Sequence, residues 1–281
     1  MILIPPAAEE EAVSPAVAAE EDSPAAEAAA AIPAEVECAS DMVSIIVPCY
    51  NEGEHIYDNL SVISETLKET GVSYEILAVN DGSKDNTWEE IKRAESFIDG
   101  VRDCGYEKNR GKGGAILHGI ECSTGDIVGF IDADLELPAS LLPGFISKMN
   151  EGCDVVIGSK MHQESQVHYP ALRKFVSWGY YIMLKILFGL KCKDTQTGIK
   201  LYKGDLIRAI GKVQQINSYA FDIEQLALAN SKKAKIAEMP VEVHYTREGS
   251  FSRISLGTII GMFFDTIKIW WDLRIRKKYS F

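Results

Sequence analysis

Short apolar runs alternate along this chain with longer stretches in which apolar residues recur every three or four positions. Val43–Pro48 and Glu75–Asn80 have the length and the β-branched content of buried strands. Residues 54–70 carry apolar side chains at helical spacing, as on the buried face of an amphipathic helix. The same reasoning predicts further strands at 101–104, 127–132 and 155–159, and further helices at 85–98, 115–124 and from Pro138 onward. Strands that alternate with helices in this way predict an α/β fold, whose mostly parallel sheet is covered by helices on both faces.

Two apolar segments, Phe175–Cys192 and Ile254–Trp271, are longer than the predicted strands, but charged residues interrupt both. Because neither offers about 18 uncharged apolar residues in a row, no membrane-spanning helix is predicted. Read as helices, both carry a narrow polar stripe, formed by Lys174, Ser177, Tyr181 and Lys185 in the first and by Asp265, Lys268, Asp272 and Arg276 in the second. Such helices are typical of segments that lie in a membrane interface, with the basic residues of 274–278 near anionic headgroups. The alternative is packing against the domain or against a partner subunit in a homo-oligomer.

The charge of the chain is concentrated at its start. Residues 1–41 consist largely of Ala, Glu and Pro and contain ten acidic but no basic side chains, a composition typical of disordered segments. They account for most of the formal net charge of −12 and leave residues 42–281 at −2, so nucleic-acid binding is not expected. We therefore predict three parts: a disordered segment at 1–41, a globular domain at 42–253, and an amphipathic membrane-surface helix with a basic tail at 254–281.

The six cysteines are scattered along the chain and form no Cys-x-x-Cys motif. This distribution favours reduced, mostly buried thiols over a disulfide framework or a zinc site. Residues 1–41 also lack the basic start and the long apolar core of a signal peptide. Together with the amphipathic segments, these features predict a cytoplasmic protein that associates peripherally with the cytoplasmic face of a membrane.

Two aspartates, Asp132 and Asp134, follow directly on the apolar run at 127–131. Residues at i and i+2 of a strand point to the same side, so both carboxylates are expected to face one spot beyond the strand's carboxyl end. Paired carboxylates suit Mg²⁺ or Mn²⁺, hard cations that share oxygen ligands with substrate phosphates. The alternative is that the two aspartates end the strand and cap the next helix.

Polar residues also follow the first two predicted strands. Glu52 and Asp81, together with Pro48 and Tyr50, are candidates for holding a nucleoside, because carboxylates accept hydrogen bonds from ribose hydroxyls and base N–H groups. In mostly parallel sheets, ligands bind at the carboxyl ends of the strands, where these residues and the Asp132/Asp134 pair converge. The alternative for Asp81-Gly-Ser is an ordinary turn.

The loop Lys108–Ala115 contains three glycines and three basic residues ahead of a helix. Lys112 and Gly113 within it are candidates for diphosphate binding, through a cationic side chain and backbone N–H groups at a helix start. The loop lacks the spaced lysine and hydroxyl of a P-loop, which argues against an ATPase. A flexible, solvated loop is the alternative.

Two polar clusters follow later in the chain, Asp194–Lys200 and Phe221–Glu224. Asp194, Asp222 and Glu224 are candidates for facing a substrate. Helix capping by the two aspartates is the alternative, which their spacing alone favours.

With these segments assembled, the chain resembles the family-2 glycosyltransferases of GT-A fold. Val43–Glu52, Val79–Thr87 and the Asp132/Asp134 pair resemble that family at large. The segments Lys108–Ala115, Asp194–Leu201 and Ala220–Glu224 resemble its dolichyl-phosphate glucosyltransferase branch, to which the dolichyl-phosphate mannosyltransferases are related. The likeness covers residues 42–255, and the motifs keep the family's order.

The resemblance implies that Glu52 and Asp81 contact the nucleotide and that Asp132 and Asp134 hold the metal on the donor diphosphate. Glu136 is a third candidate metal ligand. Where the glucosyltransferase branch commonly has Gly after its Asp-x-Asp, this chain has Leu135, closer to the mannosyl relatives. Both UDP-glucose and GDP-mannose therefore stay open as donors. The Gln-x-x-Arg-Trp signature of processive synthases and the membrane-spanning tail of some relatives are absent from this sequence.

The expected reaction is a metal-dependent, inverting transfer of a hexose from the nucleotide sugar to a polyprenyl (dolichyl) phosphate. The acceptor is already anionic, so positioning and charge neutralisation should matter more than a general base. Asp134 and Asp194 are candidate catalytic residues, and Lys160 and Arg173 fall where the resemblance implies contacts with the acceptor phosphate. The alternatives are transfer to a glycan or another non-lipid acceptor, a binding module with a decayed site, and a nucleotidyltransferase.

Overall fold

The computed structural model describes residues 41–165, 171–244 and 256–279. For residues 171–177, 256, 258 and 259 it describes the backbone but not the side chains. The predicted disordered segment, apart from Asp41, therefore lies outside the described residues. The strands are β1 Val43–Cys49, β2 Tyr74–Asn80, β3 Val101–Asp103, β4 Ile127–Ile131, β5 Val155–Ser159, β6 Ile199–Lys203 and β7 Ile236–Pro240. The helices are α1 Ile56–Glu69, α2 Thr87–Phe97, α3 Lys112–Cys122, the short 3₁₀ turn η1 Ala139–Leu141, α4 Leu142–Asn150, α5 Ala171–Phe188, α6 Gly204–Gly211, α7 Phe221–Ser231 and α8 Leu256–Arg274.

The seven strands form one sheet in the order β3-β2-β1-β4-β6-β5-β7. All neighbouring pairs are parallel except β4 with β6 and β5 with β6, because β6 runs in the opposite direction. The predicted mostly parallel sheet is thus confirmed. The predictions did not include β6 or β7. In β6, Lys200 and Lys203 interrupt the apolar residues, so the sequence shows no continuous apolar run although the first four residues of the strand are buried.

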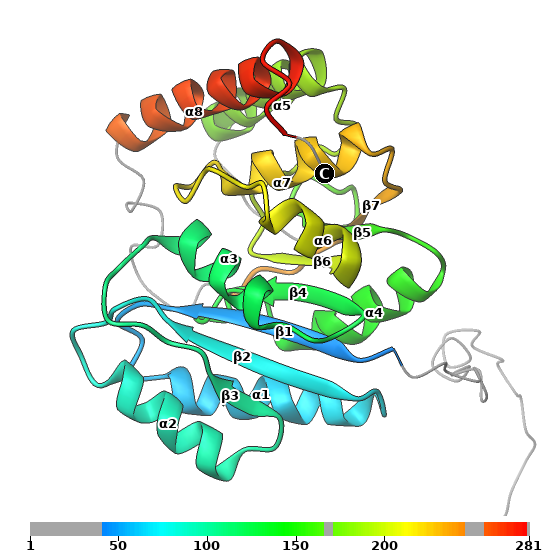
Figure 1. Ribbon diagram of the computed structural model, residues 1–281. Coiled ribbons are helices and arrows are strands. Elements are labelled where there is room, and N and C mark those ends of the chain that lie inside the picture. The colour runs from blue at the N-terminus through cyan, green and yellow to red at the C-terminus, as the bar shows by residue number, and fades with distance from the viewer. Residues whose placement is uncertain (1–40, 166–170, 245–255, 280–281) are drawn as a thin grey trace, which may run out of the picture. The chain divides into compact units, whose positions relative to one another are not determined.

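Side chains of each strand alternate between two cores, as the period of a strand requires. Ile45 of β1 packs on the core under α1, α2 and α4, whereas its neighbour Ile46 packs on the core under α3, α6 and α7. Figure 1 shows these two helical layers on opposite sides of the sheet. The predicted helices on both faces are confirmed. Burial on both faces explains why the strands appear in the sequence as continuous apolar runs.

Two predicted helix starts differ in detail. The helix predicted from Asp85 begins at Thr87 with Asn86 at the N-cap position, and Asp85 instead accepts a hydrogen bond from the Thr87 N–H at 3.1 Å. Pro138 precedes the 3₁₀ turn η1, so α4 begins only at Leu142.

The two amphipathic segments form α5 and α8, which lie together over α7 at the top of Figure 1. Within the predicted polar stripe of α8 the two aspartates face the domain, because Asp272 is 2% exposed and Asp265 accepts a hydrogen bond from Ser218 Oγ at 2.6 Å, whereas Lys268 and Arg276 are exposed. Large apolar side chains point outward instead, including Phe264, which is 66% exposed, and Trp271. No helix in the described residues combines the length and apolarity needed to cross a bilayer.

Candidate active site

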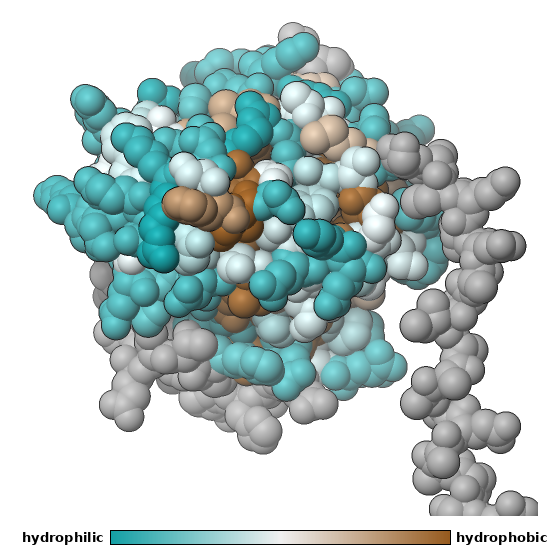
Figure 2. All heavy atoms as spheres, turned by 90° about the horizontal axis from the view of Figure 1, so that it is seen from below, coloured by the Kyte–Doolittle hydropathy of each residue, from teal (hydrophilic) through white to brown (hydrophobic). Residues whose placement is uncertain are grey.

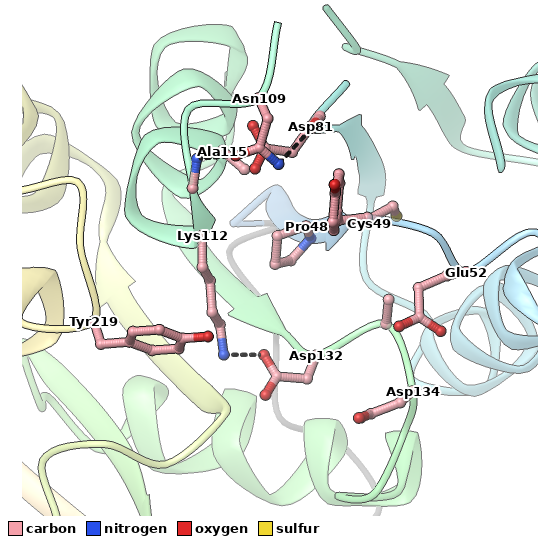
Figure 3. Close-up of a pocket in the computed structure, with 13 residues that line it drawn as sticks. Pro48, Cys49, Glu52, Asp81, Asn109, Lys112, Ala115, Asp132, Asp134 and Tyr219 are labelled. Atoms are coloured by element: carbon pink, nitrogen blue, oxygen red, sulfur yellow. Dashed lines mark hydrogen bonds and ion pairs between the residues drawn. The ribbon is translucent and has the colours of Figure 1, made fainter. Parts of the chain in front are cut away.

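A cavity of about 370 Å³ opens at the carboxyl ends of β1, β2 and β4. The parallel strands end at this edge together, with Cys49 of β1 paired to Asn80 of β2. The lining residues are Pro48, Cys49, Tyr50, Glu52, Asp81, Asn109, Gly111, Lys112, Ala115, Asp132, Ala133, Asp134 and Tyr219. Figure 3 shows how the loops after the three strands and the start of α3 surround it. We call it the donor cavity.

Asp81 lies just beyond β2 with its carboxylate held on one side. Its Oδ1 accepts hydrogen bonds from Tyr106 Oη at 2.7 Å and from the Arg110 N–H at 2.7 Å. Burial, and then the hydrogen bond to Asp81, raises the pKa of the Tyr106 phenol, which therefore stays protonated and donates. Both bonds are made to Oδ1, and Asp81 also lines the donor cavity. Sequence reasoning missed Tyr106.

Asp132 and Asp134 both line the donor cavity, one residue apart in the turn that follows β4. Burial, followed by the charge of Asp132, raises the pKa of Asp134, as expected for crowded carboxylates. Lys112 reaches across from the start of α3, and its Nζ lies 2.5 Å from Asp132 Oδ1 (Figure 3). Apart from this ion pair, Asp132 Oδ1 is buried and accepts no hydrogen bond from the described residues.

Lys112 carries its positive charge in this position. Burial alone lowers the pKa of Lys112, but the charges of Asp132 and then Asp222 outweigh burial and raise it. The lysine therefore partly neutralises a site that is otherwise acidic.

The carboxylates of Asp132 and Asp134 are suitable ligands for a hard divalent cation, because they offer oxygen atoms close together in an anionic part of the cavity. Within the described residues, no three His, Cys, Asp or Glu side chains converge to hold a metal by themselves. A cation here needs further oxygen ligands, such as a diphosphate and water, which is typical of Mg²⁺. Glu136 does not line the donor cavity, but its backbone N–H donates to Asp134 Oδ1 at 3.2 Å.

Gly198 adjoins this pair from the loop before β6. Its carbonyl accepts a hydrogen bond from the Asp132 N–H at 3.1 Å. A Cβ at position 198 would lie 2.3 Å from Asp132 Oδ2, so the carboxylate occupies the space of the missing side chain. Sequence reasoning placed Gly198 within a polar cluster and gave it no role.

Gly113, a candidate for diphosphate binding, packs against the loop before α7 and is not among the residues that line the donor cavity. Its N–H donates to the Asn217 carbonyl at 3.2 Å, and a Cβ there would lie 2.8 Å from that oxygen. Gly113 therefore lets α3 approach the loop before α7, while its neighbour Lys112 faces the cavity. Gly111, which has a φ of 79°, forms the N-cap of α3.

A second cavity of about 280 Å³ adjoins the donor cavity, and Lys112 and Tyr219 line both. It is lined further by Lys160, Met161, Tyr180, Tyr181, Leu184, Lys193, Asp194, Thr195, Gln196, Phe221, Asp222 and Met262. Asp194 accepts a hydrogen bond from the Lys160 N–H at 2.9 Å, which joins two of the predicted site residues. The side chain of Arg173, a third candidate, lies outside the described residues.

Asp222 reaches the second cavity from the first turn of α7, where it forms a buried ion pair with Lys200 of β6. The Lys200 Nζ lies 2.6 Å from Asp222 Oδ1 and also donates to the Thr197 carbonyl at 2.8 Å. Burial raises the pKa of Asp222, and the charges of Lys200 and then Lys112 oppose that rise. This pair fixes the wall between the sheet and the second cavity.

Glu224 does not face either cavity, contrary to the possibility left open from the sequence. It is fully buried and accepts hydrogen bonds from the backbone N–H groups of Gln215 and Ile216. Tyr279 Oη also donates to it at 2.6 Å. Its role is to tie the loop before α7 to the segment after α8.

The sequence was compared with known families, and residues 44–211 match the profile described as Glycosyl transferase family 2. A dolichyl-phosphate β-glucosyltransferase of Trichomonas vaginalis is 33% identical over 254 residues, covering 84% of this chain and 77% of the relative. A dolichol-phosphate mannosyltransferase of Pyrococcus furiosus is 30% identical over 201 residues, covering 70% of this chain but only 55% of the relative.

Among solved structures, glucosyl-3-phosphoglycerate synthase from Mycobacterium tuberculosis, in complex with Mn²⁺, UDP and glucosyl-3-phosphoglycerate, superposes with a TM-score of 0.61. The match has 20% identity and covers 83% of this chain and 80% of that one. At this identity the likeness concerns the fold alone, and it confirms the predicted α/β architecture.

Proposed function

Since this chain belongs to glycosyltransferase family 2, we propose that it transfers a hexose from UDP-glucose or GDP-mannose to a polyprenyl phosphate such as dolichyl phosphate. The observation that carries the proposal is the pair of adjoining cavities that share Lys112 and Tyr219. The donor cavity offers carboxylates for a nucleotide and a cation, and the second offers lysines for an anionic acceptor. The names of the two relatives, which act on dolichyl or dolichol phosphate, support the same acceptor.

In this proposal the nucleoside lies between Pro48, Tyr50, Glu52 and Asp81. The Tyr50 side chain, 44% exposed, offers a ring face to the base, and Asp81 accepts a hydrogen bond from a base N–H. Lys112 contacts the diphosphate.

Asp132 and Asp134 hold Mg²⁺ or Mn²⁺ in the same proposal. When bound, the cation stabilises the negative charge that develops on the leaving diphosphate. Glu136 acts on this site through Asp134, to which its backbone donates.

The reaction is a direct displacement. An oxygen of the acceptor phosphate forms a bond to C1 of the hexose while the bond from C1 to the diphosphate oxygen breaks. The nucleoside diphosphate leaves with the electron pair, and the anomeric centre inverts. Lys160 and Arg173 hold the acceptor phosphate, while Asp194 keeps Lys160 in place through its backbone N–H. Because the acceptor carries no proton to remove, positioning and charge supply the rate acceleration.

The surroundings of the second cavity support a membrane-bound acceptor. Tyr180, Tyr181 and Leu184 of α5 and Met262 of α8 line it, so an acceptor chain leaving this cavity meets the two amphipathic helices. The outward surface of α5, α8 and the turn after α8 carries exposed apolar side chains, namely Trp178, Ile186, Ile260, Phe263, Phe264, Trp271 and Ile275. By contrast, the face seen from below, over α1 and α2, is mostly hydrophilic with separate small apolar spots (Figure 2). We propose peripheral membrane association through α5 and α8.

The test is a transfer assay with purified protein, Mg²⁺ or Mn²⁺, and polyprenyl phosphate in vesicles. UDP-glucose, GDP-mannose and UDP-N-acetylglucosamine, each radiolabelled in the sugar, are supplied separately. We expect label in the lipid extract with one of the first two donors and none with the Asp134→Asn variant. Label that appears only in a water-soluble acceptor such as a glycan would contradict the proposal.

A further inference from the structure

Lys112 occupies the position in which its charge competes most directly with a divalent cation. It is the first residue of α3, and its Nζ reaches Asp132 Oδ1 at 2.5 Å. Apart from Lys112, no described residue donates a hydrogen bond to that buried oxygen, so Lys112 supplies its compensation. A cation that approaches the carboxylates of Asp132 and Asp134 therefore meets a positive charge already bound to one of them.

The side chain has room for a second position. About a third of Lys112 is exposed, and it lies at the junction of the two cavities, with Asp222 on the other side. A lysine places its ammonium at the end of a flexible four-carbon stem, so a change of partner requires only side-chain rotation. A donor diphosphate in the first cavity would offer Lys112 several anionic oxygens in place of one carboxylate oxygen.

We propose that Lys112 is an exchangeable counter-ion, which holds Asp132 while the site is empty and moves to the donor diphosphate when nucleotide binds. This inference rests on the proposed function. It makes the affinities for metal and nucleotide depend on each other. Without nucleotide, Lys112 opposes the cation at Asp132, and with nucleotide it leaves the carboxylate to the cation and adds a contact to the diphosphate. Thermodynamic linkage requires the same coupling factor when measured from either ligand.

The experiment measures Mn²⁺ binding directly, by the loss of the free Mn²⁺ signal in electron paramagnetic resonance, with and without saturating UDP or GDP. In the unmodified protein, nucleotide should tighten Mn²⁺ binding strongly. Lys112→Met should bind Mn²⁺ about tenfold more tightly without nucleotide, because a nearby like charge has gone. The factor by which nucleotide tightens Mn²⁺ binding should be about tenfold smaller in Lys112→Met than in the unmodified protein.

Two further variants make the result specific. Lys112→Arg keeps the charge and should behave like the unmodified protein. Lys203→Met is the matched control, since Lys203 Nζ also pairs with an aspartate, Asp154 Oδ1, at 2.7 Å. That pair lies outside both cavities, and its removal should leave Mn²⁺ binding unchanged.

The outcomes separate this inference from the proposed function. Asp134→Asn should abolish the nucleotide-dependent Mn²⁺ site. Suppose that Asp134→Asn abolishes this site, but that Lys112→Met, measured without nucleotide, binds Mn²⁺ no more tightly than the unmodified protein does. The counter-ion role of Lys112 is then wrong, while the donor site stands. Suppose instead that Asp134→Asn binds Mn²⁺ as the unmodified protein does, with UDP and with GDP. The assignment of the donor site is then wrong, and so is the counter-ion role that rests on it. Circular dichroism of each variant excludes unfolding as the cause.

Discussion

At the scale of single residues, two neighbours, Lys112 and Gly198, set the environment of Asp132. Lys112 supplies a charge to Oδ1, Gly198 leaves space beside Oδ2, and the Gly198 carbonyl holds the backbone of Asp132. Asp134 has a different environment, since burial and the charge of Asp132 both raise its pKa. Two aspartates that are equivalent in the sequence motif are therefore distinct in the folded protein.

The first prediction concerns Asp134. Asp134→Asn removes one charge from the proposed cation site without changing the size of the side chain. Loss of charge stabilisation of this kind lowers turnover by about 10²–10³-fold. Transfer kinetics with saturating metal measure the effect, and near-normal turnover would refute the assignment.

The second prediction concerns Gly198. In Gly198→Ala the new Cβ falls 2.3 Å from Asp132 Oδ2, so the carboxylate must move. We expect turnover to fall by about 10²-fold, because small misplacements of reacting groups have effects of this size. Gly144→Ala is the control, since its Cβ meets no atom closer than 3.5 Å, and it should keep full activity. Equal activity in both variants would show that Gly198 has no part in placing Asp132.

At the scale of secondary-structure elements, the two ends of the strands are used differently. At the amino ends, Glu75 of β2 joins four elements: it accepts hydrogen bonds from Ser44 Oγ of β1 at 2.7 Å and from the Thr124 N–H before β4 at 2.8 Å, and it pairs with Arg102 of β3. At the carboxyl ends, the polar groups of the loops are left facing a cavity. At the amino ends, Glu75 thus joins neighbouring strands to one another, whereas at the carboxyl ends polar groups line a cavity.

The third prediction follows from Glu75. Burial raises the pKa of Glu75, but the hydrogen bonds from Ser44, Thr124 and Arg102 together outweigh burial and lower it. A carboxyl whose pKa is lower folded than unfolded stabilises the protein above its unfolded value of about 4.3, and this stabilisation is lost as the pH falls through the folded pKa. Glu75→Gln should lower the free energy of unfolding by about 1–3 kcal/mol at neutral pH.

The unmodified protein should also lose more stability on acidification than the Glu75→Gln variant does. Urea unfolding at neutral pH and at about pH 3.5 measures both differences. A variant with the same acid dependence as the unmodified protein would show that Glu75 is not perturbed in the folded state.

The fourth prediction concerns α8. Ile269 and Asp272 of this helix are buried against the domain, so deletion of the helix would uncover the surface beneath them, and point substitutions test its outer surface better. Replacing Phe264 and Trp271 by Ser removes two exposed aromatic side chains, and should weaken binding to vesicles by about tenfold or more.

Phe97 on α2 provides the matched control for the fourth prediction. It is 77% exposed and lies on the other side of the sheet, so Phe97→Ser should leave vesicle binding unchanged. Flotation with neutral and anionic vesicles measures the partition. Equal losses in the two proteins would indicate nonspecific adsorption, and no loss in either would exclude the outer surface of α8 as the contact.

At the scale of the whole molecule, the charge of the chain divides at the start of the fold. Residues 1–41 hold ten acidic and no basic side chains, whereas the rest is nearly balanced at −2. The backbone N–H of Met42 bonds Asp126 Oδ2 at 3.1 Å, and β1 begins one residue later. The sheet therefore starts immediately after the acidic segment.

The fifth prediction is that residues 1–41 are dispensable for folding and catalysis. Their composition lacks the apolar side chains needed to join a core. A chain starting at Met42 should unfold within about 2 °C of the full chain and keep its turnover, as measured by calorimetry and the transfer assay. A truncated protein that aggregates or turns over more slowly would give residues 1–41 a structural or catalytic part.

The sequence by itself determined the strands β1 to β5 and the edge of the sheet at which their polar loop residues gather. Strand and helix patterns are local, and parallel strands place their carboxyl ends on one edge, so Glu52, Asp81 and the Asp132/Asp134 pair could be brought together without coordinates. The family motifs added the expectation that these residues bind a nucleotide-sugar donor. The position of polar residues that directly follow a parallel strand can thus be predicted from the order of the elements along the chain.

Only the tertiary structure decided what surrounds those residues. Lys200 appears as an exposed residue in the sequence, yet it is buried because Asp222, 22 positions later, neutralises it from α7. The antiparallel insertion of β6 beside β4 brings Gly198 against Asp132, and the loop before α7 brings Tyr219 to the junction of the two cavities. Local periodicity carries no information on such pairings, because they depend on how the elements pack together.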